Sequence, residues 1–129
     1  MTGATATPQC SLRDLTIAPR QLAELRRLSR QVMRLLGVSR AAEAIVLQGL
    51  TELLSNVAKH VPVPRCSVQI THADGTVRVA VCDCSARPPE VTTPDWDSES
   101  GRGLWLLREM ASDFGWEPTA DGKRVWFTV

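Results

Sequence analysis

The sequence has almost no net charge, no long apolar run and no internal repeat. Its 129 residues hold 15 Lys and Arg against 14 Asp and Glu, a net charge of +1. A general nucleic-acid binder is expected to show a basic excess, so direct nucleic-acid binding is not expected. No apolar run approaches the roughly 18 residues of a membrane span. Residues 1–10 lack the basic start and apolar stretch of a secretory signal.

The four cysteines also lack the spacing of a zinc site. They are Cys10, Cys66, Cys82 and Cys84, and none forms the C-x2-C pair typical of structural zinc. Cys82 and Cys84 flank Asp83 in a predicted strand, so both would point to one face. Reduced thiols in a cytoplasmic protein are therefore favoured over a metal site or a disulfide.

The chain length predicts one domain, over 10–129, after a disordered lead-in at 1–9. A short strand over 10–17 is followed by two amphipathic helices. From Pro19 to Gly37, apolar residues recur at steps of three and four. Ser39 offers an N-cap for a second helix from about Arg40 to Lys59.

Alternating strands dominate the second half of the chain. Two runs, 65–72 and 77–83, are separated by Asp74-Gly75, a strong hairpin signal. A long loop over 84–100 follows, and such a loop in a compact domain is usually functional or mobile. A helix from Gly103 to about Ser112, then a strand, a turn and a strand, complete the chain. Because helices and antiparallel strands are segregated, the order predicts an α+β fold with helices on one sheet face.

The second helix carries polar residues at a regular spacing. Glu52, Asn56 and His60 are four residues apart and share one helix face. An ordinary solvated face explains this spacing, and a functional site explains it as well. In a functional site, the Asn56 carbonyl oxygen would suit Mg²⁺ and Glu52 would orient or deprotonate a hydroxyl or water.

Asp83 ends the row of Val77, Val79 and Val81 and is expected to face inward, where a carboxylate needs a partner. An adenine amine would be one partner; a backbone N–H or Arg87 is the alternative.

Two glycines, Gly101 and Gly103, bracket Arg102 at the start of the later helix. Free N–H groups there favour an anion, although a plain glycine-rich turn is an equal interpretation. A dinucleotide-binding motif is excluded, because no strand precedes these glycines and the third glycine is replaced by Leu106.

Taken in order, these motifs resemble the GHKL ATP-binding superfamily, and more narrowly the bacterial anti-sigma-factor serine kinases of the actinobacterial type. The segments that carry the resemblance are "ELLSNVAKH", "VCD" with the following "PP", and "GRGLWLLREMASDFGW". The resemblance covers about residues 10–129. It implies a Bergerat-type α/β sandwich with a mixed, mostly antiparallel sheet and helices on one face.

The resemblance also implies a role for each matching residue. Glu52 would be the general base that activates a serine hydroxyl of a protein substrate. Asn56 would be the Mg²⁺ ligand, and Asp83 would accept a hydrogen bond from the adenine amine of ATP. Residues 92–100 would form a mobile lid, and the phosphate-side box would comprise Gly101, Arg102, Gly103 and Leu104.

The sequence departs from the family pattern directly after Asp83. The family's D-x-G-x-G reads Asp83-Cys84-Ser85-Ala86-Arg87 here, so both glycines are replaced. Side chains at these positions would narrow the adenine end of the pocket.

The resemblance implies a kinase that phosphorylates a STAS-type anti-sigma-factor antagonist, sequesters a sigma factor and forms a homodimer. A non-catalytic, nucleotide-binding partner-switching regulator is the alternative. A detached histidine-kinase domain is less well supported, because the chain lacks a dimerisation helix and a phosphoacceptor segment. Five arginines on the first helix form either a solvated face or a docking patch for an acidic sigma-factor segment: Arg20, Arg26, Arg27, Arg30 and Arg34.

Overall fold

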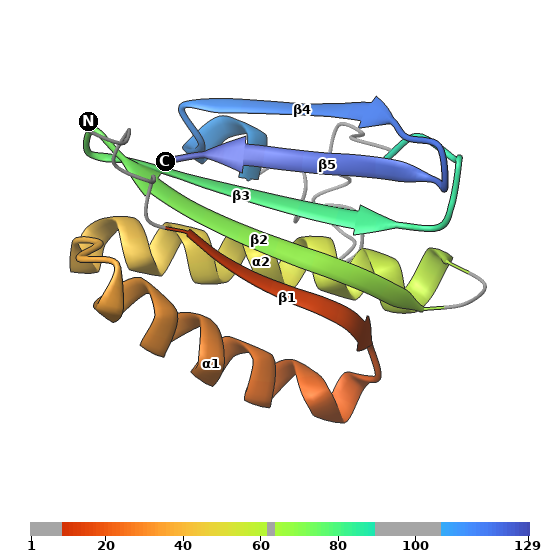
Figure 1. Ribbon diagram of the computed structural model, residues 1–129, viewed down its shortest axis with the longest axis horizontal. Coiled ribbons are helices and arrows are strands. Elements are labelled where there is room, and N and C mark those ends of the chain that lie inside the picture. The colour runs from red at the N-terminus through yellow and green to blue at the C-terminus, as the bar shows by residue number, and fades with distance from the viewer. Residues whose placement is uncertain (1–8, 62–63, 90–106) are drawn as a thin grey trace, which may run out of the picture.

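The computed structural model describes residues 9–61, 64–89 and 107–129, which form a five-stranded sheet with two α-helices packed on one of its faces (Figure 1). The elements in chain order are β1 (Gln9–Thr16), a 3-10 turn (Pro19–Gln21), α1 (Leu22–Leu35), α2 (Arg40–His60), β2 (Arg65–Ala73), β3 (Thr76–Asp83), β4 (Asp113–Pro118) and β5 (Lys123–Thr128). Residues 107–110 add one short helical turn before β4.

The strand order is β1-β2-β3-β5-β4, and every described pairing is antiparallel. The α+β class and the mostly antiparallel sheet predicted from the sequence are therefore confirmed. The last strand, β5, lies between β3 and β4. Its first residue, Lys123, is paired with Asp83, and Asp83 is paired on its other side with Cys66.

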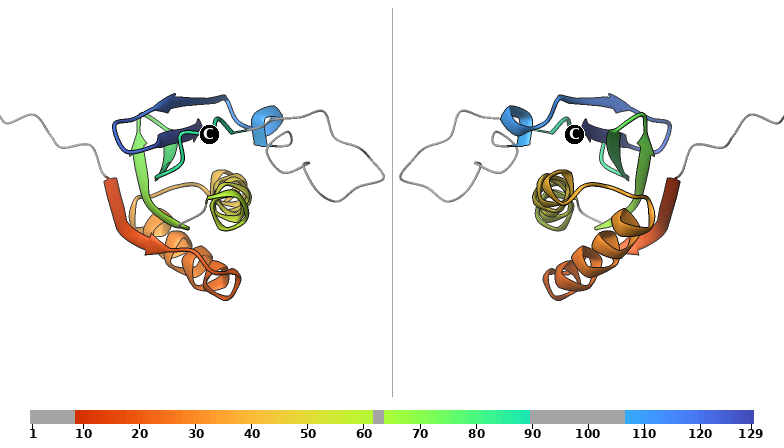
Figure 2. Two further views of the ribbon diagram at one scale, coloured as in Figure 1. Left: turned by 90° about the vertical axis from the view of Figure 1, so that its right-hand side faces the viewer. Right: turned by 90° about the vertical axis from the view of Figure 1, so that its left-hand side faces the viewer.

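The core lies between the sheet and α2. Figure 2 shows α2 beneath the sheet, with α1 on one side of it and the helical turn 107–110 on the other. Burying the apolar face of each element against the other removes both faces from water, which is the main stabilising term in such a two-layer domain. The least exposed large side chains of this core are Phe127, Met33, Leu50, Leu54, Ile70 and Leu107.

Local signals in the sequence set the ends of the elements. The Ser39 hydroxyl accepts a hydrogen bond from the Ala42 N–H at 3.2 Å, so Ser39 is the N-cap of α2 as predicted. Gly37, which separates α1 from α2, has a φ of 77°. Asp74 and Gly75 have φ values of 51° and 76°, the left-handed conformation that a two-residue hairpin turn requires.

The predicted boundaries hold to within a few residues for both helices and the first three strands, and the predicted strand, turn and strand at the end of the sequence are β4 and β5. Of the predicted helix from Gly103 to Ser112, the described part is helical at 107–110. The predicted lid (92–100) lies outside the described residues. The predicted lead-in (1–9) also lies outside them except for Gln9, the first residue of β1.

The four cysteines are free, with Cys66 buried and Cys84 exposed. Cys84 follows Asp83, the last residue of β3, so it lies outside the strand in which it was expected to flank Asp83 with Cys82. Among the helices that the structure describes, none has the length and apolar character needed to cross a membrane.

Candidate functional site

Glu52 and Asn56 lie on α2 and are both half-buried. Neither side chain forms a hydrogen bond or an ion pair that involves the described residues, whereas the neighbouring Thr51 is fully engaged. Its hydroxyl donates to the Leu47 carbonyl and accepts from Arg26 of α1, both at 2.7 Å. Within the described residues, the polar groups of Glu52 and Asn56 thus keep their hydrogen-bonding capacity. The side chain of His60, the third residue of the predicted set, lies outside the described part.

The position of Gly49 identifies the elements that lie opposite the face of α2 that carries Glu52 and Asn56. Residues three and seven positions apart on a helix share a face, so Gly49 lies in the same row as both. A Cβ at Gly49 would lie 2.6 Å from Leu107 Cδ1 and 2.7 Å from Phe127 Cζ. The row therefore faces β5 and the helical turn 107–110, and Thr51 marks the side toward α1.

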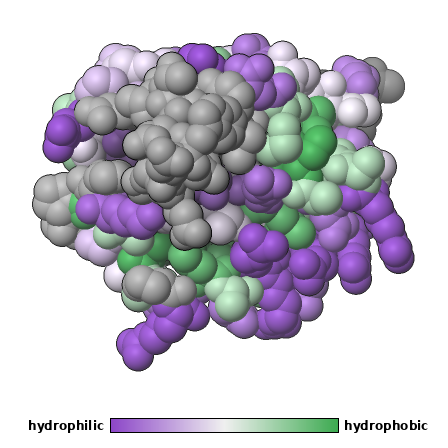
Figure 3. Space-filling view, turned by 180° about the vertical axis from the view of Figure 1, so that it is seen from behind, coloured by the Kyte–Doolittle hydropathy of each residue, from purple (hydrophilic) through white to green (hydrophobic). Residues whose placement is uncertain are grey.

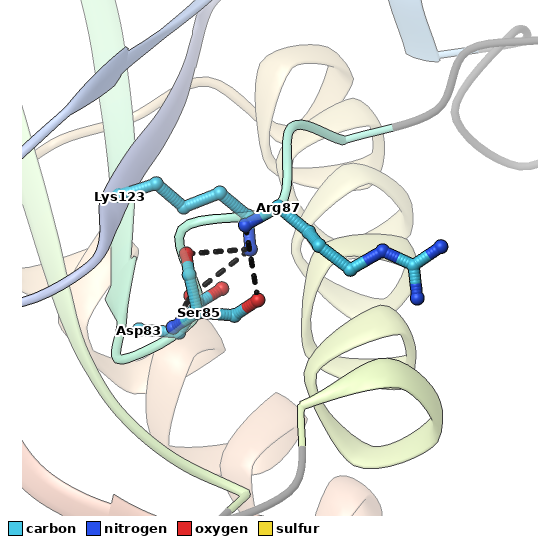
Figure 4. A network of polar contacts seen from close by, with 4 residues as sticks. All are labelled: Asp83, Ser85, Arg87 and Lys123. Carbon is cyan, nitrogen blue, oxygen red and sulfur yellow. Dashed lines mark hydrogen bonds and ion pairs between the residues drawn. The ribbon is translucent and has the colours of Figure 1, made fainter.

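Asp83 faces the helix-covered side of the sheet, as predicted, and is 9% exposed. Its Oδ1 accepts the Ser85 N–H at 2.9 Å and the Lys123 ammonium at 3.0 Å (Figure 4). Lys123 Nζ also donates to the Ser85 carbonyl at 3.4 Å. Charge pairing and hydrogen bonds offset the cost of removing these two groups from water.

Of the two protein partners that the sequence offered for Asp83, a backbone N–H and Arg87, the structure contains only the first. The backbone N–H contact is confirmed, but Arg87 is exposed and its side chain points away from the carboxylate (Figure 4). Lys123 takes the place expected of Arg87 and was missed, because it is distant in the sequence. The available signal was the alternation of Lys123, Val125 and Phe127, which puts the lysine on the buried face of β5.

Cys66 is the cross-strand neighbour of Asp83 and shares its buried face. Burial, and after it the neighbouring negative charges of Asp83 and Cys82, together raise the pKa of the Cys66 thiol to about 12. Cys66 is therefore a neutral thiol at physiological pH and adds no charge beside the Asp83–Lys123 pair.

A close approach between two chain segments fixes the position of Asp83. A Cβ at Gly122 would lie 2.0 Å from the Asp83 carbonyl oxygen, so only glycine fits there. Gly122 immediately precedes Lys123 and thereby brings the start of β5 against the end of β3.

These groups gather at one end of the molecule. The C-terminal half of α2, the end of β3 and the start of β5 lie together there (Figure 1). The structure thus brings the helix that carries Glu52 and Asn56 to the end that holds Asp83 and Lys123. The predicted phosphate-side residues lie outside the described part: Gly101, Arg102, Gly103 and Leu104.

The arginines of the first helix are largely engaged within the protein. Arg26 donates to Thr51, Arg27 pairs with Glu24, and Arg30 and Arg34 lie 3.4 and 3.9 Å from the oxygens of the buried Glu43. Arg20 is exposed. Seen from behind, the face that bears the helices carries broad hydrophilic areas with apolar patches between them (Figure 3). Four of the five arginines thus hold α1 together or attach it to α2.

Comparisons with known proteins agree with this architecture. A search of curated proteins finds no match. The structure is similar to the RsbU and RsbW domains of Rv1364c from Mycobacterium tuberculosis, with a TM-score of 0.70 and 19% identity. The likeness covers 95% of this chain and 32% of that one, so this chain spans about a third of its length. A family model described as "Histidine kinase-like ATPase domain" matches residues 15–129. The chain therefore belongs to the histidine kinase-like ATPase domain family.

Proposed function

We propose that the protein is an ATP-dependent serine kinase of the anti-sigma-factor type. It would phosphorylate an anti-sigma-factor antagonist and, in its other state, sequester a sigma factor. The observation that carries the proposal is the pair Glu52 and Asn56, half-buried and without a polar partner among the described residues, on the helix whose C-terminal half lies at the same end of the molecule as Asp83. Structural similarity to a protein with an RsbW domain supports the narrower assignment.

The residues present fit a bound Mg-ATP. Asp83 supplies a buried carboxylate whose Oδ2 accepts no hydrogen bond from the described residues, and it would accept the adenine amine. The Asn56 carbonyl oxygen would be a ligand to Mg²⁺, a hard cation that favours oxygen and is commonly shared with substrate phosphates. When bound, Mg²⁺ would offset the negative charge of the phosphates. Gly101, Arg102, Gly103 and Leu104 would approach the phosphates.

Glu52 would act as the general base. It would take the proton from a serine hydroxyl of the antagonist as the serine oxygen forms a bond to the γ-phosphorus. The bond from that phosphorus to the β–γ bridging oxygen would break, and ADP would leave. The Glu52 carboxylate forms no hydrogen bond or ion pair with the described residues that would have to break first.

Phosphoryl transfer tests the proposal directly. The protein is incubated with γ-labelled ATP, Mg²⁺ and a candidate antagonist, and labelled serine is measured. We expect Glu52→Ala and Asn56→Ala to lose the label while remaining folded, because neither removes a hydrogen bond or an ion pair to the described residues. Gln48→Ala, exposed one turn earlier on α2, is the matched control and should keep the label.

The test also separates kinase activity from the alternative function. Wild-type protein that binds ATP but transfers phosphate to no antagonist would be a nucleotide-binding partner-switching regulator. Light scattering of the purified chain tests the proposed homodimer, and co-purification with a sigma factor tests sequestration.

A further inference from the structure

We propose that Lys123 and Asp83 together read the base edge of adenine. In this assignment the Lys123 ammonium donates to the ring nitrogen N1, and Asp83 Oδ2 accepts from the neighbouring exocyclic amine. The inference rests on the proposed function, because it assigns a second base-reading residue to the same nucleotide site.

The hydrogen-bond donors and acceptors of the Asp83–Lys123 pair are not all used by the described residues. A lysine ammonium has three N–H donors and no acceptor. One is directed to Asp83 Oδ1 at 3.0 Å and one to the Ser85 carbonyl at 3.4 Å, so one is left over. Oδ1 of Asp83 is used twice, by the ammonium and by the Ser85 N–H, while Oδ2 is used by no described residue. Toward the described residues, the pair thus leaves one donor and one acceptor unused.

Burial makes these spare groups significant. Lys123 is 7% and Asp83 9% exposed, and an unsatisfied polar group in such a position carries a desolvation penalty. Ser29 Oγ is the one fully enclosed side-chain N or O atom without a partner in the described part. Asp83 Oδ2 is not an atom of this kind, and in the proposed site a ligand group reaches it.

The adenine edge has the complementary pattern. Its N1 is an acceptor, and the exocyclic amine beside it is a donor. A carboxylate alone matches only the amine, because an ionised carboxylate has no hydrogen to donate to N1. With Lys123 held against Asp83 by the ion pair, donor and acceptor are fixed side by side before the base arrives. A site built to hydrogen-bond both atoms rejects an analogue that lacks one of them.

Atom-substituted nucleotides test the assignment without any mutation. The wild-type protein is titrated calorimetrically with the Mg²⁺ complexes of ATP, 1-deaza-ATP and 7-deaza-ATP. We expect 1-deaza-ATP, in which a C–H replaces N1, to bind about 10- to 100-fold more weakly than ATP, the usual effect of a hydrogen bond to a charged group. We expect 7-deaza-ATP, which keeps N1, to bind like ATP.

The same titrations on Lys123→Met locate the donor. This variant should bind ATP and 1-deaza-ATP equally, both close to the wild-type affinity for 1-deaza-ATP. Arg124→Met is the matched control: it removes a positive charge from the next residue of β5, on the opposite face of the sheet, and should keep the discrimination. Circular dichroism confirms that each variant is folded.

Three results would overturn the assignment. Wild-type protein that binds ATP and 1-deaza-ATP equally would show that N1 receives no hydrogen bond. Tighter binding of ATP by Lys123→Met would show that the lysine blocks the carboxylate. Preference for GTP over ATP would show that the pair reads another base. Failure of the wild-type protein to bind ATP at all would instead refute the proposed function itself.

Discussion

Breaking the Asp83–Lys123 ion pair from one side is expected to destabilise the protein strongly. The two side chains are 4% and 9% exposed, and their charged atoms are 3.0 Å apart. At an effective dielectric constant of about 20, the gross attraction at this distance is about 5 kcal/mol. Lys123→Met removes that attraction and leaves a buried carboxylate with one backbone N–H. Loss of one partner of a buried pair typically costs about 3–5 kcal/mol, and we expect a value in this range.

Replacing both partners should cost less than replacing either one. Asp83→Leu with Lys123→Met leaves no uncompensated charge, and an apolar pair of similar volume often matches a buried ion pair in stability. Urea denaturation of the nucleotide-free protein measures the free energy of unfolding of the singles and the double. The exposed pair Arg124–Glu117, with side chains 43% and 51% exposed, is the reference: Arg124→Met should cost less than about 1 kcal/mol. If Lys123→Met costs no more than Arg124→Met, the buried pair is solvated and the reasoning is wrong.

Two further predictions concern the core. Gly49→Ala should lower the free energy of unfolding, measured by urea denaturation, by about 1–2 kcal/mol. The added methyl group would contact Leu107 and Phe127, which are 1% and 0% exposed. This overpacking outweighs the gain of about 1 kcal/mol in helix propensity. A stabilised variant would show that these contacts yield easily. Because the Cys66 pKa is about 12 in the fold against 9.0 for a free thiol, the unfolded chain loses this proton first. Stability should therefore decline as pH rises from 9.0 towards 12, by at most about 1.4 kcal/mol per pH unit from this group. Subtracting the pH profile of Cys66→Ala isolates this component, and identical slopes would contradict it.

Features that depend on neighbouring residues were predictable from the sequence. The Asp74-Gly75 turn, the Ser39 cap and the alternation in β3 are each encoded within a few residues, and the structure has all three. The inward orientation of Asp83 followed from that alternation. Period and turn chemistry are local, so they need no knowledge of the partners across the sheet.

The partner of Asp83 depended on topology and could not be predicted in the same way. Antiparallel pairing of β3 with β5 brings Lys123 opposite Asp83, and nothing near either residue specifies that β5 lies between β3 and β4. Arg87 was favoured by its closeness in sequence, but the short segment after β3 turns its side chain outward. A buried charge pairs with the oppositely charged group that the sheet buries beside it, because only that group leaves water together with it.

The backbone after Asp83 does not require the two glycines that the family pattern has there. A glycine is required where φ is positive or where another backbone comes too close for a Cβ. Among non-glycine residues in the described part, only Asp74 has a positive φ, so residues 84–87 hold conformations that any side chain tolerates. The close approach at Asp83 is met instead from the β4–β5 turn, where Gly122 lies against the Asp83 carbonyl. Close packing at this end thus rests on a glycine of the β4–β5 turn, and the residue that follows it supplies the ammonium. Conformation and charge at Asp83 are therefore set by the same two adjacent residues of the C-terminal hairpin.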